Sequence, residues 1–289
     1  MGKVKIKRKS TLIDMTAMSD VTVLLLTFFM LTSTFLQKEP TIVYTPSSIS
    51  EEKVPFKNLV TILVSSSDKS GRLSDPTITE GKIFLSLSGD SILSTDSLRY
   101  KVLDEAVKIY NTAGGGVRNG EIKLDAKQRD AFVKTNMMGT PFKDLPAVLA
   151  LEPVKRDQLM GDLTTTDPAR AQMIGIPIDV PKNDRTTNRQ SNLNDFQVWM
   201  QAIKSVAQDA KNAKIESDTK AGLLDPAAPD YKEKVRELEM FYNALMQGQA
   251  ISIKADKDTP FSVINMIFDN LRSVDLNKFT LMTALKSNS

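Results

Sequence analysis

One carboxylate, Asp20, stands at the start of a long apolar run and is the residue best placed to do chemistry in this chain. From Val21 to Leu36 the run contains only apolar and hydroxylic side chains. An ionised carboxylate at bilayer depth is unfavourable by about 2.5–3.5 kcal/mol on insertion scales. Such a group needs a partner, a water-filled path or a proton. Asp20 is therefore a candidate functional site.

The run has the length and the flanks of a membrane-spanning helix. A bilayer core about 30 Å thick needs roughly 20 residues of helix, and residues 11–36 supply them. Residues 1–10 form a basic leader, and no comparable basic excess follows the run. The positive-inside rule then places the N-terminus in the cytoplasm and everything after Gln37 on the other side. The basic residues of the leader are Lys3, Lys5, Lys7, Arg8 and Lys9.

A cleaved signal peptide is the competing interpretation, because it also combines a basic start with an apolar run. Two aspartates interrupt this run, and Thr32-Ser33-Thr34 is a poor cleavage site. A lipoprotein anchor is excluded because the chain has no cysteine. We therefore expect the segment to remain as an anchor.

Helical periodicity predicts which side chains share a face with Asp20. At about 100° per residue, one stripe holds Asp20 together with hydroxylic and leucine side chains. Asp14 lies off this stripe, near the cytoplasmic headgroups. The threonines can instead bond back to carbonyls of their own helix, and Asp20 can be a surface charge at a frayed helix start. The predicted members of the stripe are Thr16, Asp20, Leu24, Thr27, Leu31 and Thr34.

Composition excludes several classes of function. The chain has neither histidine nor cysteine, which removes Ser-His-Asp and Cys-His catalysis and every zinc site that needs imidazole. No carboxylate pair stands out, so we expect no enzyme, no cofactor and no metal. The net charge of +3 comes largely from the leader, so the remainder carries no nucleic-acid footprint. Gly114-Gly115-Gly116 lacks the lysine of a phosphate loop.

After the anchor, proline and serine mark residues 37–57 as an extended linker. Its apolar patch Ile42-Val43-Tyr44 can alternatively form a short strand or a docking segment. Residues 58–110 begin an α+β domain, with β-branched runs at 59–64 and 82–87 that predict two antiparallel strands. Helical spacing of apolar residues follows from 98 to 110.

Residues 111–229 have the character of an insertion, mainly helical and loop. We predict helices at 125–138 and 144–151, and mostly loop at 164–191, where three prolines occur. Asn192 or Asn194 is an expected N-cap for a helix whose apolar stripe indicates core rather than a partner site. That stripe comprises Phe196, Trp199, Met200, Ile203, Val206, Ala207 and Ala210.

Residues 230–289 complete the domain as helix–strand–helix–strand. The first helix starts near Pro229 and ends at Gly248; strands follow at 251–255 and 279–282, separated by a helix from Pro260 to Val274. A right-handed crossover makes these two strands parallel. The expected fold is thus α+β: one N-terminal transmembrane helix, then one mixed sheet with helices on one face.

The anchor resembles the transmembrane signature of the ExbD/TolR biopolymer-transport family. The resemblance rests on Ile13-Asp14-Met15-Thr16, Met18, Asp20-Val21 and the run Leu24 to Thr32. It departs at Ala17, where the family usually has proline, so the helix entry should be straighter. A second similarity lies in the C-terminal strand–helix–strand unit. There Asp256 follows the first strand, and an aromatic residue, Phe261, follows Asp256.

The resemblance implies an inner-membrane protein of Gram-negative bacteria with a periplasmic C-terminal domain. It implies two copies of this helix inside an ExbB/TolQ-like polytopic partner, with Asp20 carrying protons down the proton gradient. The periplasmic domain would pass motion to a TonB-like or TolA-like protein. An ExbD-like role in energising TonB-dependent transport, a TolR-like role in envelope maintenance and a tethered periplasmic or wall-binding adaptor remain the alternatives.

Overall fold

The computed structural model describes residues 15–32, 43–48, 59–65, 82–88, 96–112, 120–135, 137–163, 165, 167–178, 193–257, 259–282 and 284–285. The chain divides into two compact units, Met1–Lys38 and Glu39–Ser289. In the first unit, the structure describes helix α1 (Met15–Thr32). Among the described residues, no helix combines the length and apolar character needed to cross a bilayer. The predicted span of residues 11–36 extends beyond the described part at both ends, so it stays a prediction.

The second unit is built on a mixed five-stranded sheet with the order β4-β3-β2-β5-β6. The antiparallel pairing of β2 with β3 and the parallel pairing of β5 with β6 were both predicted and are confirmed. The strands are β2 (Leu59–Ser65), β3 (Lys82–Ser88), β4 (Met137–Met138), β5 (Ile251–Ala255) and β6 (Phe279–Met282). A separate pair joins β1 (Ser47–Ser48) to β7 (Ala284–Leu285) in parallel.

Helices connect and cover these strands, and several of their ends are chemically defined. Asn194 is the N-cap of α8: its side chain accepts from the Gln197 N–H while the Gln197 side chain accepts from the Asn194 N–H, which is a capping box. Gly248, after α9, has φ +91°, as expected of a glycine that ends a helix. The helical elements are α2 (Asp96–Thr112), α4 (Ala126–Val133), the 3₁₀ turn η2 (Phe142–Asp144), α5 (Leu145–Leu149), α6 (Pro153–Gly161), α7 (Pro168–Gln172), α8 (Asp195–Lys220), α9 (Tyr231–Met246) and α10 (Phe261–Ser273).

The predicted helix at 125–138 was too long. Helix α4 ends at Val133 because the Arg99 guanidinium donates to the carbonyls of Val133 and Thr135. The chain then forms β4, which pairs with β3. Similarly, the predicted loop at 164–191 contains helix α7, whose N-cap Asp167 accepts from the Ala169 N–H. Residues 179–192 lie outside the described part.

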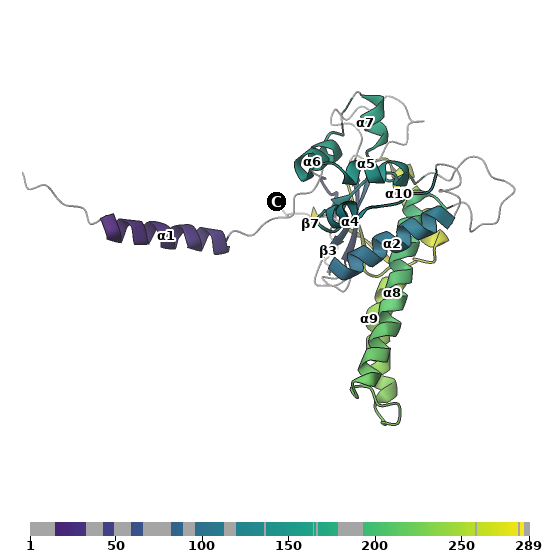
Figure 1. The fold of residues 1–289 in the computed structure, drawn as a ribbon. Coiled ribbons are helices and arrows are strands. Elements are labelled where there is room, and N and C mark those ends of the chain that lie inside the picture. Colours follow the sequence, from purple (N-terminus) through teal and green to yellow (C-terminus); the bar gives the residue numbers. More distant parts are fainter. Residues whose placement is uncertain are drawn as a thin grey trace, which may run out of the picture. The chain divides into compact units, whose positions relative to one another are not determined.

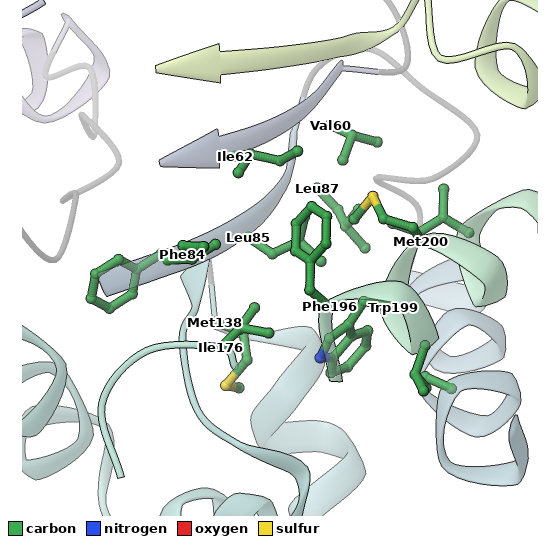
Figure 2. Close-up of a cluster of buried hydrophobic side chains, with 14 of the residues drawn as sticks. Val60, Ile62, Phe84, Leu85, Leu87, Met138, Ile176, Phe196, Trp199 and Met200 are labelled. Atoms are coloured by element: carbon green, nitrogen blue, oxygen red, sulfur yellow. The ribbon is translucent and has the colours of Figure 1, made fainter. Parts of the chain in front are cut away.

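The core lies between the sheet and helix α8. In Figure 2 the side chains of Val60, Ile62, Leu85 and Leu87 lie on the side of the sheet that faces α8. Helix α8 presents the stripe predicted from the sequence, and its members Phe196, Trp199, Met200, Ile203, Val206 and Ala207 are all buried. The stripe is therefore core, as predicted. The other face of the central strands is buried too, since Leu63, Phe84 and Ser252 are fully buried.

Four stacked aromatic rings join α2, in the first part of the domain, to residues 111–229. Tyr110 stacks on Phe142 with centroids 4.8 Å apart, and Phe142 stacks on Trp199 at 4.9 Å. Trp199 in turn stacks on Phe132 at 5.5 Å. Because Tyr110 ends the first part of the domain and the other three rings belong to residues 111–229, this stack ties the insertion into the core.

A buried polar network does the same at the start of α8. The Asn194 amide donates to the Ile178 carbonyl at 2.7 Å and to Asn270 Oδ1 at 2.6 Å. Gln197 Nε2 donates to Ser273 Oγ at 2.7 Å. Buried amides with all partners in place fix a unique packing, so α10 is held in register with the start of α8.

Helices α8 and α9 form a hairpin whose joined end extends beyond the sheet (Figure 1). Asp218 closes this end: its carbonyl accepts from the N–H groups of Leu223 and Leu224, and its carboxylate pairs with Lys214 at 2.8 Å. The hydrogen bond to Asp218 raises the pKa of Lys214 above its usual value. Burial raises the pKa of Tyr242 on α9. Between the two helices, Lys211 of α8 lies 3.9 Å from Glu239 of α9.

The aromatic stack predicts a large stability effect at its centre. Trp199→Ala should lower the free energy of unfolding by about 3–5 kcal/mol, because it removes a fully buried side chain and leaves a cavity. Val154→Ala is the control, since Val154 is 67% exposed and should change stability by less than about 0.5 kcal/mol. Urea unfolding followed by far-ultraviolet circular dichroism measures both. Equal effects would contradict the assignment of Trp199 to the core.

Candidate functional site

Asp20 lies within a continuous helix. Helix α1 begins at Met15, five residues before Asp20, so Asp20 lies beyond the first four residues, whose N–H groups lack a partner within the helix. Because α1 is a continuous helix, the helical repeat places five predicted members of the stripe along one side. These are Thr16, Asp20, Leu24, Thr27 and Leu31.

The described apolar side chains of α1 are exposed around the helix. Asp20 is exposed among them. A helix that is apolar on all sides needs an apolar environment on all sides. At least half of the surface is exposed on each of Met18, Val21, Val23, Leu24, Leu25, Leu26, Phe28, Phe29 and Met30.

Two threonines of α1 satisfy their hydroxyls within the helix. Thr27 Oγ1 donates to the Leu24 carbonyl at 2.9 Å, and Thr22 Oγ1 donates to the Met18 carbonyl at 2.6 Å. For Thr27 the back-bonded alternative therefore holds. Thr34 and Asp14, the other predicted polar positions, lie outside the described residues. Asp20 is thus the group on the stripe with a charge to gain or lose.

Sequence reasoning did not find a role for the turn that follows β5. Asp256 begins this turn and is buried; its N–H donates to the Val64 carbonyl at 3.0 Å, and its carbonyl accepts from the Thr259 N–H at 3.0 Å. Its carboxylate accepts from the Tyr44 N–H at 3.2 Å. Asp256 therefore joins the end of β2, the end of β5 and residue 44. The one available signal was an aspartate directly after a buried strand.

Residues 43–48 pack on this turn. Val43 is buried, and the Tyr44 carbonyl accepts from the Lys257 N–H at 2.7 Å. Ser47 and Ser48 then pair with β7. Of the patch Ile42-Val43-Tyr44, Val43 and Tyr44 are therefore docked on the domain, and Ile42 lies outside the described residues. The extended linker stays an expectation for the other residues of 37–57.

Other charged groups do not assemble into a site. Among the described residues there is no group of three or more aspartates or glutamates that could hold a metal ion. Arg156 on α6 is buried, and burial lowers its pKa from the usual value while Asp157 acts in the opposite direction. The described part of the chain thus offers Asp20 as its clearest chemical group.

The described residues thus combine a carboxylate-bearing apolar helix with an α+β domain. Residues 7–129 match the family model described as biopolymer transport protein ExbD/TolR, which confirms the resemblance predicted for the anchor. The similarity predicted for the C-terminal strand–helix–strand unit lies outside the matched residues and stays a prediction. The match covers less than half of the 289 residues and includes α1, the β2–β3 pair and α2. Neither a curated protein nor a solved structure matches the chain significantly.

The Asp256 turn predicts that residues 43–48 can be released by one substitution. Asp256→Ala removes the acceptor for the Tyr44 N–H, so chymotrypsin should cleave after Tyr44 several-fold faster than in the wild type. Asp256→Asn keeps an acceptor oxygen and should stay close to the wild-type rate. Asp269→Ala, an exposed carboxylate of α10, is the matched control. An unchanged cleavage rate in Asp256→Ala would show that this carboxylate does not hold the segment.

Proposed function

We propose that this chain is the proton-carrying subunit of an inner-membrane motor of the ExbB–ExbD type, which energises TonB-dependent transport across the outer membrane. The observation that carries the proposal is Asp20 on the continuous helix α1, whose described apolar side chains are all exposed. The match of residues 7–129 to the ExbD/TolR model supports a subunit of a biopolymer-transport motor. Residues 11–36 form the membrane span, with the N-terminus cytoplasmic and the domain periplasmic.

The mechanism follows from the chemistry of one carboxyl group in an apolar helix. Facing an apolar wall, a carboxyl group favours its neutral, protonated form because burial penalises charge. Facing a hydrated gap, it releases the proton and becomes a carboxylate. Moving one charge through 100 mV supplies about 2.3 kcal/mol. Alternation of Asp20 between these two settings can therefore turn proton flow into movement of one subunit against another.

Such a path needs more than this helix. Two copies of one short helix cannot enclose a proton pathway, and the exposed apolar side chains of α1 call for neighbours on every side. A polytopic ExbB/TolQ-like protein supplies them, with a pair of copies of this chain inside its ring. Leu24 and Leu31 flank Asp20 on its stripe and would pack against the wall, while Thr16, Thr27 and Thr34 line the hydroxylic part.

The periplasmic domain transmits the motion to a TonB-like protein, or to a TolA-like protein in the TolR-like alternative. The two roles share the same membrane machinery and differ in the receiving partner. Loss of iron or haem uptake on deletion favours the ExbD-like role. Detergent sensitivity and division defects favour the TolR-like role. The docked residues 43–48 supply the mechanical connection, because force on the anchor reaches the sheet through the Asp256 turn.

Asp20→Asn should abolish energised transport while leaving the complex assembled. The substitution keeps the size of the side chain and removes the group that gains and loses a proton, so uptake should fall to the level of a deletion. Thr22→Val is the matched control on the same helix, because Thr22 lies off the Asp20 stripe and its hydroxyl donates to the Met18 carbonyl. Substrate uptake by whole cells and co-purification of the polytopic partner measure the two properties. Wild-type transport in Asp20→Asn would disprove the proton-carrying role.

A further inference from the structure

One buried cation, Arg156 on α6, has no counter-charge in the described part of the chain. Three charged side chains are buried among the described residues: Arg156, Asp218 and Asp256. Asp218 pairs with Lys214 at 2.8 Å, and the Asp256 carboxylate accepts from the Tyr44 N–H. Arg156 is 3% exposed, yet its Nε and Nη1 atoms are enclosed without a hydrogen-bond partner. Arg156 is therefore the exception among the three.

A guanidinium group cannot resolve this situation by giving up its proton. A buried lysine can become neutral, whereas arginine stays charged in proteins. Taking a charge out of water is costly unless an opposite charge and hydrogen bonds compensate it. Buried charges in folded proteins are accordingly paired. The position of Arg156 thus calls for an anion.

The described carboxylates of α6 and its N-cap do not supply this negative charge. Asp157 follows Arg156 directly and is exposed, and successive residues of a helix do not face each other. Glu152, at the N-cap, pairs with Lys155 at 3.3 Å. Residues four apart share a face of a helix, so Arg156 shares its face with Met160, which is 2% exposed. The inner face of α6 therefore combines the guanidinium with an apolar side chain.

The guanidinium is not closed off at all three of its nitrogens. Nε and Nη1 are enclosed, whereas Nη2 has no partner among the described residues and is not fully enclosed. Arginine binds carboxylate and phosphate groups through two parallel hydrogen bonds. The pair of donors is either Nε with Nη2 or Nη1 with Nη2, so both arrangements use the nitrogen that is not enclosed. An oxyanion that reaches Nη2 can thus also satisfy one of the two enclosed donors.

We propose that Arg156 binds a small oxyanion, a carboxylate or a phosphate group, at the inner face of α6. The anion accepts charge-assisted hydrogen bonds from the guanidinium and neutralises its buried charge. Residue 156 lies outside the residues that match the family model. The site therefore belongs to the insertion, and it does not rest on the function proposed for Asp20.

Calorimetric titration of the full-length chain in detergent tests the site, with inorganic phosphate and acetate added separately in Tris–chloride buffer of constant ionic strength. We expect at least one of the two anions to bind at one site per chain, and Arg156→Met to weaken that binding at least tenfold. Lys155→Met is the matched control, because it removes an exposed cation from the same helix and should leave binding unchanged. Binding of neither anion by the wild type, or equal binding by Arg156→Met, would overturn the proposal.

Urea unfolding gives a second readout that does not depend on measuring the bound anion. Without oxyanion, Arg156→Met should raise the midpoint of unfolding, because an apolar side chain replaces an unpaired buried charge. The anion that binds should raise the midpoint of the wild type and leave that of Arg156→Met unchanged. A lower midpoint in Arg156→Met, together with no effect of either anion on the wild type, would show that the chain itself supplies the counter-charge. That result would overturn the oxyanion site and leave the proposed function of Asp20 standing.

Discussion

The parallel pairing of β2 with β5 is the constraint on which the second unit depends. Val60 to Val64 pair in register with Ile251 to Ala255, so residues from opposite ends of the domain share the centre of one sheet. Both faces of β2 are buried, and a slip of one residue would exchange its two sets of side chains. The chain between these two strands, which includes β3 and β4 of the same sheet, must therefore return to this register.

That requirement explains how a long insertion fits within a small sheet. Residues 111–229 contribute the edge strand β4, the stacked rings of Phe132, Phe142 and Trp199, and the capped start of α8. The Asn194–Asn270 bond returns the insertion to α10, and α10 leads directly into β6. Among the described residues, the joined end of the α8–α9 hairpin extends away from this packed arrangement (Figure 1). The insertion is thus a part of the core from which one helical hairpin extends.

Much of this fold was predictable, because its elements carry strong local signals. The β-branched run at 59–64, the Asn194 cap and the apolar stripe around Trp199 each specify their structure from neighbouring residues alone. Strand β4 was missed because two methionines have no strand signal of their own and pair only because β3 lies beside them. The docking of Tyr44 on Asp256 was left open for the same reason: the two residues meet only after β2 and β5 have paired. Asp20 could be recognised because a carboxylate in an apolar run is costly wherever the fold places it.

The central claim is that the Asp20 face of α1 packs inside a polytopic membrane partner. Photo-crosslinking from single positions of the full-length chain in its native membrane tests this most directly, with mass spectrometry of the products. A crosslinker at Leu24, on the Asp20 stripe, should capture a polytopic ExbB/TolQ-like protein, and that protein should exceed this chain in the purified complex. Recovery of only wall components or soluble periplasmic proteins would contradict the account and leave the helix as a simple anchor.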